Sequence, residues 1–421
     1  MLRQLGGFET VLWLLDQTRS IHFVTAAEIA GHIPVSQWEK GLESLQRRHP
    51  LLSVCIREKG PLQPAFYRVE GRPIPLRVVQ DEAESRLDRE LEAEMDQTFD
   101  YSVAPLMRAV LIEGKDRSTI ILTIHHSIGD GISALYLVRD LLQAISGQPL
   151  SSLPLPPTHE SLLGIYSTAA AASTKNAAIP PTTAATTPSR PPSSNDYRVP
   201  QALPRIQHTQ LSPAETTSLI ERCRKEGTTV HGALCAAFVL AGRQALTDWH
   251  ARPIRVQSLI SSRKALDIKD DLCVYFATHM LTVDSHPLTD FWELARQAKH
   301  NLAASETKEA IRENARLLQG VADAEAGVLA TDQIRLEGFA NEIQLSNLGI
   351  APYGSTFGAL QVRSVWGGMS FSGGDDQYVA GIVTANGSLS ILLGARKPLG
   401  DFLTVASQIL KTASQPEKAL L

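Results

Sequence analysis

The chain has 421 residues, and its 40 Lys and Arg against 44 Asp and Glu give a formal net charge of only −4. This balance excludes a nucleic-acid binder that works by bulk charge, and 43% hydrophobic with 20% charged residues excludes disorder throughout. At about 100 to 200 residues per domain, the length predicts two domains.

Two further classes are disfavoured by local composition. No run is long and apolar enough for a membrane span or signal peptide, since the best candidate, residues 10–15, is cut by Asp16. Four cysteines are scattered along the chain: Cys55, Cys223, Cys235 and Cys273. Without a CxxC pair or a histidine at ligand spacing, they predict reduced, buried thiols of a cytoplasmic protein and no metal site.

Elements of the N-terminal part follow from apolar spacing. Four of them precede residue 125: helices over 35–49 and 81–96, and the strands of a hairpin over 107–113 and 118–124. The second strand leads directly into the heptad 125–131, and apolar residues at helical spacing follow over 132–145. This order predicts a strand, a tight loop and a helix.

A proline-rich interval divides the chain. Residues 151–205 hold 10 of the 24 prolines beside runs of Ala, Ser and Thr. Such a composition cannot bury enough apolar surface to offset its ordering entropy, which predicts a surface linker. The predicted organisation is an N-terminal domain over 1–150, a linker over 151–205 and a C-terminal domain over 206–421.

The C-terminal part again alternates between helix and strand. Ser212 as N-cap and Pro213 at the first helical position mark a helix start. The predicted helices cover 212–225, 229–246 and 288–305, and the predicted strands cover 254–259, 280–283, 342–345, 360–365, 378–384 and 388–393. Both halves are therefore expected to be mixed α/β.

The heptad His125-His126-Ser127-Ile128-Gly129-Asp130-Gly131 fits the pattern HHxxxDG. Its glycines allow a tight turn and the close approach of another group, and Asp130 stands where a carboxylate can cap the helix. Neighbouring residues at a strand end point to opposite faces, so one histidine should face a cleft and the other the core. Neutral imidazole suits a general base at pH 7. The alternatives are two ligands of one metal or two structural histidines.

At this point the chain resembles a known superfamily. The HHxxxDG motif, residues 47–52 upstream of it and residues 99–108 between these two segments are similar to the corresponding motifs of condensation-domain and chloramphenicol-acetyltransferase-like acyltransferases. Residues 227–234 and 346–349 resemble stand-alone polyketide-associated acyltransferases and alcohol acetyltransferases. The resemblance spans nearly the whole chain except the linker. It implies two subdomains, each a mixed sheet flanked by helices, forming a pseudo-dimer with a cleft or tunnel between them.

The resemblance also implies roles for single residues. His126 becomes the catalytic base, and Asp130 a structural residue that pairs with an arginine of the other half. Arg263 is the candidate partner, the alternative being a solvated surface charge. Gly131 would leave room beside His126 for a pantetheine arm.

The stabiliser of the tetrahedral oxyanion is not identified by a motif. Ser346, Asn347 and Ser370 (or Ser372) are candidates, although each could be a turn residue. The chain lacks the DFGWG signature of plant relatives, of which Trp366 with its two following glycines is at best a remnant.

The predicted activity is transfer of an acyl group from a coenzyme A or acyl-carrier-protein thioester to an acceptor hydroxyl, with no bound cofactor. The alternatives are an amide-forming condensation enzyme with an amine acceptor and a catalytically silent module that docks carrier proteins. No GxSxG elbow supports a serine hydrolase, and no phosphate-binding glycine loop supports a nucleotide site.

Overall fold

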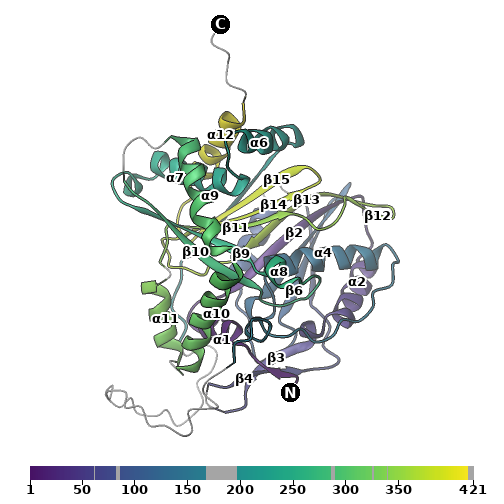
Figure 1. The fold of residues 1–421 in the computed structure, drawn as a ribbon. Helices are drawn as coiled ribbons and strands as arrows, with labels where there is room; N and C mark the ends of the chain where they lie inside the picture. The colour runs from purple at the N-terminus through teal and green to yellow at the C-terminus, as the bar shows by residue number, and fades with distance from the viewer. Residues whose placement is uncertain are drawn as a thin grey trace, which may run out of the picture.

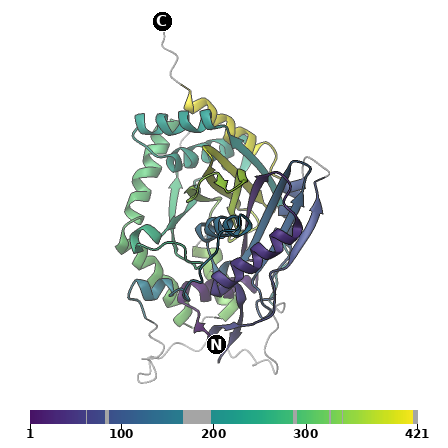
Figure 2. The ribbon, with the colours of Figure 1, turned by 90° about the vertical axis from the view of Figure 1, so that its right-hand side faces the viewer.

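The computed structural model describes residues 1–60, 62–81, 86–166, 197–285, 290–324, 327–338 and 340–415. Two six-stranded sheets form the centre of the described part, and a small third sheet pairs β1 (Arg3–Gln4), β4 (Pro64–Arg68) and β3 (Val54–Glu58). Figure 2 shows the two halves beside each other, the N-terminal half in purple to blue and the C-terminal half in teal to yellow. This is the predicted two-part mixed α/β architecture.

The N-terminal sheet has the order β12-β13-β2-β7-β6-β5. Its strands are β12 (Thr356–Phe357), β13 (Leu360–Met369), β2 (His22–Ala30), β7 (Arg117–His125), β6 (Met107–Glu113) and β5 (Leu76–Gln80). β7 is buried at every position after its first, as expected for an apolar strand at the centre of a sheet. The predicted hairpin of β6 and β7 is confirmed.

The two strands β12 and β13 belong to the C-terminal part of the sequence but lie in the N-terminal sheet (Figure 1). β13 pairs antiparallel with β2, where Trp366 stands opposite Ala26. Its apolar side chains join a cluster of buried residues between the two sheets, which includes Val24, Trp366 and Leu392. The two halves therefore share a sheet and a core.

The C-terminal sheet has the order β10-β9-β11-β14-β15-β8. Its strands are β10 (Phe276–Val283), β9 (Ile254–Ser261), β11 (Ile343–Ile350), β14 (Tyr378–Ala385), β15 (Ser388–Ala395) and β8 (Arg205–Leu211). Five of them contain the predicted strands, and β8 was not predicted. β10 begins four residues before its predicted start, while β11 and β13 continue past their predicted ends, and these extensions carry residues of the candidate site.

Five α-helices precede residue 163 in the described part of the chain. They are α1 (Gly7–Asp16), α2 (Val35–Arg48), α3 (Arg86–Asp96), α4 (Gly131–Ile145) and the short α5 (His159–Leu162). α2 lies against α4 so closely that a Cβ on Gly41 would stand 2.9 Å from Leu141 Cδ1. α2 ends where His49 turns extended before Pro50, as predicted, and residues 82–85 of the predicted second helix lie outside the described residues.

The C-terminal helices are α6 (Pro213–Lys225), α7 (Val230–Ala245), α8 (Arg263–Leu266), α9 (Phe291–Ser305), α10 (Lys308–Asp323), α11 (Gly327–Gly338) and α12 (Phe402–Ser414). Ser212 caps α6 with Glu215 in a capping box, as its sequence predicts. α10 and α11 instead pack on α1 of the other half (Figure 1). Gly7 permits this approach, because a Cβ there would lie 2.6 Å from Gln319 Cα.

The ends of the proposed linker lie on the folded halves. Leu153 N donates to Arg48 O at 2.8 Å, and Val199 N donates to Thr18 O at 3.0 Å. Residues 167–196 lie outside the described residues. The described ends are thus fixed by backbone hydrogen bonds to the N-terminal half.

Candidate active site

The HHxxxDG segment lies at the end of β7, as predicted. β7 stays paired with β2 up to His125, which stands opposite His22. A single turn follows over His126–Ile128, and α4 begins at Gly131. Asp130 caps α4 by accepting a hydrogen bond from Ser133 N at 2.7 Å. The loop is therefore held at one end by the sheet and at the other by the helix cap.

His126 is oriented for base chemistry. Its Nδ1 lies 2.9 Å from the Gly129 carbonyl oxygen, which can only accept, so Nδ1 carries the proton and Nε2 keeps its lone pair. The ring packs against Phe23 and Phe276, with centroids 4.8 and 5.6 Å away. Burial lowers the pKa of His126 to about 4. The imidazole is consequently neutral at pH 7.

His125 points away from His126 and into the interior. Its Nδ1 accepts a hydrogen bond from Ser127 N at 3.2 Å, and its Nε2 lies 3.5 Å from Asp16 Oδ2. Both side chains are fully buried. His125 lines neither of the two chambers described below. Its surroundings indicate a structural residue, as the strand period predicts for the histidine that faces the core, although the HHxxxDG resemblance places His125 in the catalytic motif beside His126.

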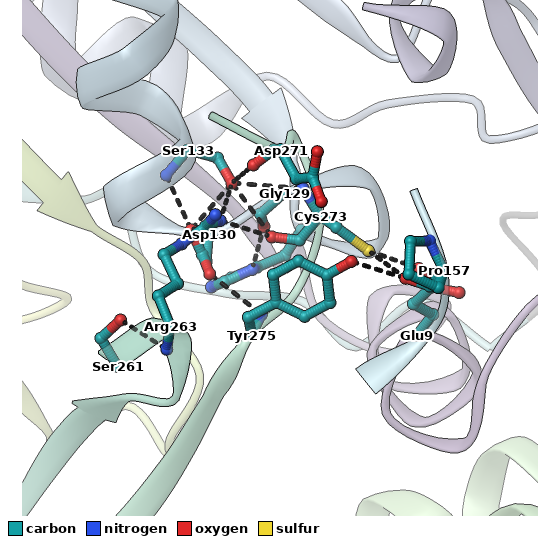
Figure 3. Close-up of polar contacts among 11 residues, drawn as sticks. Glu9, Gly129, Asp130, Ser133, Pro157, Ser261, Arg263, Asp271, Cys273 and Tyr275 are labelled. Atoms are coloured by element: carbon teal, nitrogen blue, oxygen red, sulfur yellow. Dashed lines mark hydrogen bonds and ion pairs between the residues drawn. The ribbon is translucent and has the colours of Figure 1, made fainter. Parts of the chain in front are cut away.

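Asp130 and Arg263 join the two halves (Figure 3). Arg263 Nη2 lies 3.0 Å from Asp130 Oδ1, and Asp130 Oδ2 accepts from Tyr275 N at 3.0 Å. Both side chains are 5% exposed, which excludes a solvated surface charge for Arg263. Burial alone would raise the pKa of Asp130, but the Arg263 charge and the hydrogen bonds from Ser133 and Tyr275 outweigh it and hold that pKa below its usual range.

Further polar residues around this bridge were not found on sequence (Figure 3). Ser133 Oγ lies 2.8 Å from Arg263 Nη2 and 3.0 Å from Cys273 O. Tyr275 OH donates to Pro157 O at 2.6 Å, and Cys273 Sγ lies 3.3 Å from Glu9 Oε1. No motif marks these residues, because their contacts join segments more than 100 positions apart. All four cysteines are buried and unpaired, as predicted.

Two chambers meet at His126, and each has a distinct lining. The apolar chamber, a space of about 640 Å³ including its opening to solvent, is lined by Phe8, Val11, Leu12, Leu15, His126, Gln257, Leu259, Phe276, Thr278, Leu318, Arg335, Gln344, Ser370 and Ser372. The second chamber is called the polar chamber because it is the more polar of the two. It spans about 690 Å³ including its opening to solvent and is lined by Phe23, His126, Asp130, Gly131, Ile132, Leu259, Ser261, Phe276, Gln344, Ser346, Asn347, Leu348, Gly349, Gly368 and Ser370. His126 belongs to both linings and therefore lies beside each chamber.

The predicted oxyanion candidates separate in the structure. Ser346 and Asn347 line only the polar chamber, whereas Ser370 lines both chambers beside His126. Ser370 Oγ is buried and has no hydrogen-bond partner among the described residues. An unpaired buried hydroxyl is costly unless a ligand satisfies it.

Trp366 lies apart from this site. Its side chain packs in the cluster between the sheets, against the ring of His208 with centroids 5.6 Å apart. It lines neither chamber. Gly131, in contrast, lines the polar chamber, where a Cβ would stand 2.6 Å from Leu348 Cδ2.

Among the described residues, no cluster of three His, Cys, Asp or Glu side chains is arranged to hold a metal ion. The same part of the chain contains no helix with the length and apolar character needed to cross a membrane.

The two sheets, with HHxxxDG in the loop from β7 to α4, define the class of chloramphenicol-acetyltransferase-like pseudo-dimers. Within this class the chain belongs to the condensation-domain family, whose model "Condensation domain" matches residues 11–312. Surfactin synthase subunit 2 of Bacillus subtilis (strain 168) is 26% identical over 379 residues, covering 86% of this chain and 10% of that protein. Tyrocidine synthase 3 of Brevibacillus parabrevis is 32% identical over 138 residues, 30% of this chain and 2% of that protein. The chain thus spans a tenth or less of these synthases.

Solved structures agree on the fold. Polyketide synthase associated protein 5 from Mycobacterium tuberculosis gives a TM-score of 0.68 at 19% identity, with 98% of each chain covered. TRI3 trichothecene 15-O-acetyltransferase from Fusarium sporotrichioides also gives 0.68, at 14% identity over 98% of this chain and 95% of that one. Membership in the family supports a transferase that carries out acyl transfer or condensation.

Proposed function

We propose that the protein transfers an acyl group from a thioester to an acceptor hydroxyl, with His126 as general base. The observation that supports this proposal is the neutral imidazole of His126, which lines both the polar and the apolar chamber. Its Nδ1 is held by a hydrogen bond to Gly129 O. The acceptor oxygen attacks the thioester carbonyl carbon as its proton passes to His126 Nε2. When the tetrahedral intermediate collapses, the carbon–sulfur bond breaks and the same proton passes to the leaving thiolate.

Ser370 is the proposed contact of the oxyanion in this scheme. Its hydroxyl is buried, lines both chambers and lacks a partner among the described residues. A donor placed beside the developing charge lowers the barrier because it needs no reorganisation during the reaction. Asp130 and Arg263 act by holding the loop in place rather than by touching substrate.

The donor is proposed to be coenzyme A or a carrier-protein phosphopantetheine, bound as a substrate. The polar chamber suits such an arm, because Ser261, Ser346 and Asn347 line it and can meet amide groups. Ester formation is favoured by the likeness of residues 227–234 and 346–349 to alcohol-acylating proteins. The protein itself holds no cofactor in this scheme.

Amide formation is the second candidate. It is favoured by the sequence matches to peptide synthases such as surfactin synthase subunit 2. A silent docking module is the third. The intact set of His126, Asp130 and Gly131 counts against it, because a protein that only docks a carrier has no need of an oriented neutral base.

The test is transfer by the wild-type protein and by His126→Ala. Each protein is incubated with an acyl thioester and a mixed panel of alcohols and amines, and product masses are recorded. We expect ester product, and a rate about 10²- to 10⁴-fold lower in His126→Ala, the range for loss of a positioned base. His32→Ala removes an exposed histidine and serves as the matched control.

Each other outcome points to a different conclusion. A rate near wild type in His126→Ala would remove His126 as the base. Amide product alone would replace the first candidate by the second. Thioester binding without product from any acceptor would favour the docking module.

A further inference from the structure

The apolar chamber has two unlike walls. Apolar side chains of α1 and α10 form one wall: Phe8, Val11, Leu12, Leu15 and Leu318. Polar side chains form the other: Gln257, Gln344, Ser370, Ser372 and Arg335. Gln257 and Gln344 stand side by side in register on β9 and β11. Ser372 donates to Gln344 Oε1, so the hydroxyl and guanidinium donors of this wall that keep capacity for a ligand are those of Ser370 and Arg335.

Arg335 is the strongest hydrogen-bond donor on the polar wall. It is 3% exposed, and its Nε and Nη2 donate to Asp332 Oδ1 at 2.9 and 2.7 Å. Within the part of the chain that the structure describes, its Nη1 contacts the carbonyl of Ser372 alone, at 3.5 Å, which is at the long limit for a hydrogen bond. Nη1 therefore keeps donor capacity, and Arg335 is one of the residues that line the chamber.

The charge around Arg335 decides what kind of acceptor this donor suits. Asp332 already balances the guanidinium, and the next ions, Arg19 and Asp375, pair with each other at 2.6 Å. A carboxylate in the chamber would therefore be a buried charge without a free counter-ion, which is costly. A hydroxyl or keto oxygen carries no such cost and gains a hydrogen bond from a charged donor, a stronger type of bond.

We propose that the apolar chamber binds an acyl chain with an uncharged oxygen substituent, a hydroxyl or keto group, which accepts a hydrogen bond from Arg335 Nη1. This deepens the proposed function, on which it rests for the identity of the chain as the acyl group of the donor. The polar chamber takes the pantetheine arm, so that the thioester carbonyl lies at His126 and the acyl chain continues into the apolar chamber. Arg335 then determines specificity without taking part in the chemistry.

Binding is measured separately from transfer, so that the two proposals can fail independently. His126→Ala is used with acyl pantetheine thioesters of one chain length, either unsubstituted or with a hydroxyl or keto group at successive carbons. Isothermal calorimetry gives each Kd. We expect one position of the oxygen to lower Kd about 10- to 100-fold relative to the unsubstituted chain, the range for a hydrogen bond to a charged group.

The role of Arg335 is tested by a double substitution. Arg335→Met alone would leave the Asp332 carboxylate without its counter-ion, so Asp332→Asn accompanies it. In this variant we expect the preference for the oxygenated chain to fall to about twofold or less, while the unsubstituted chain binds as before. Arg316→Met, on the exposed face of α10, is the matched control and keeps the full preference.

Three outcomes of the measurements with acyl thioesters would overturn the proposal. They are equal Kd values for oxygenated and unsubstituted chains, tighter binding of a chain that ends in a carboxylate, and an undiminished preference in the double variant. Binding of oxygenated free alcohols in place of the thioesters would assign the chamber to the acceptor and overturn it as well. Failure of transfer in the wild-type protein, with the binding preference intact, would instead contradict only the proposed function.

Discussion

At the scale of single residues, the chemistry of the site depends on which polar atoms are left without a hydrogen-bond partner in the protein. His126 is fixed by one hydrogen bond to Gly129 O and by two flanking aromatic rings, so its free nitrogen has a defined direction. His125, one residue earlier, is surrounded by the protein interior and Asp16. The strand period predicts that the two side chains point in opposite directions. The resemblance carried by HHxxxDG implies that His126 is the one that faces the site.

Ser370 carries the first prediction at this scale. Ser370→Ala should lower kcat about 10²- to 10³-fold with little change in KM, because an oxyanion contact acts only in the transition state. Ser346→Ala should change kcat by a few-fold at most, since Ser346 lines only the polar chamber and not the apolar one. Steady-state kinetics of both variants give the comparison. The reverse pattern would assign the oxyanion contact to Ser346.

The sequence could shortlist these serines but could not choose between them. Ser346 belongs to β11 and Ser370 follows β13, and only the crossing of β13 to the N-terminal sheet brings Ser370 beside His126. Arg335 had no signal at all, because its helix shows no apolar periodicity that would mark a buried face.

At the scale of elements, the start of α4 and the end of β11 are fitted to each other. Leu348 of β11 packs against two glycines, and a Cβ would stand 2.6 Å from Leu348 Cδ2 at Gly131 and 2.7 Å from Leu348 Cδ1 at Gly368. All three residues line the polar chamber. The glycine of HHxxxDG therefore makes room for a leucine of the other half, which in turn sets the width of the chamber.

Gly131→Ala tests this fit. The new methyl group should displace the flexible end of Leu348, lowering the free energy of unfolding by about 1 kcal/mol, at the low end for overpacking. Because Leu348 lines the polar chamber, its displacement should change the space there, and we expect KM for a pantetheine thioester to rise several-fold. Adding Leu348→Ala should restore KM. A rise in KM that the second substitution leaves unchanged would locate the effect in the loop around His126 instead.

Local pattern predicted many of the helices and strands, including β7, α4 and the capped start of α6. It missed β3 to β5 and α12, whose partners lie in their own half, and β2, which pairs with β7 and β13. It also missed α1, α10 and α11, which pack across the two halves. Gly7 shows why: its role is to admit the backbone of Gln319, more than 300 positions away. These three helices supply six of the residues that line the apolar chamber, so the part of the site proposed to select the acyl chain was among the least predictable.

At the scale of the whole molecule, the two halves are joined by several different contacts. β13 adds to the N-terminal sheet, Asp130 of the N-terminal half forms an ion pair with Arg263 of the C-terminal half, and α10 packs on α1. The composition of residues 151–205 predicts a boundary between two domains, and the family resemblance implies the ion pair. Pairing between strands that are distant in sequence, in contrast, leaves no local pattern from which it could be predicted. Such connections make one cooperative unfolding transition the expectation.

Buried histidines should make this transition sensitive to acid. Burial lowers the pKa to about 4 for His126, His159 and His231, and to about 3 for His22. In the unfolded chain the same groups titrate near 6.5. Between these values the unfolded state binds more protons than the folded state, so the free energy of unfolding is highest above about pH 6.5 and falls as the pH decreases toward 4. Urea unfolding at pH 7.5 and 5 measures the difference.

His159 offers a matched variant for the same measurement. Both of its ring nitrogens are buried without a hydrogen-bond partner among the described residues, so His159→Phe removes a titrating group and no hydrogen bond. We expect this variant to lose less stability between pH 7.5 and 5 than the wild type, whereas His32→Ala, at an exposed position, loses as much as the wild type. An equal loss in His159→Phe would mean that His159 takes up its proton in the folded state, and the acid sensitivity would then have to come from carboxylates such as Asp130.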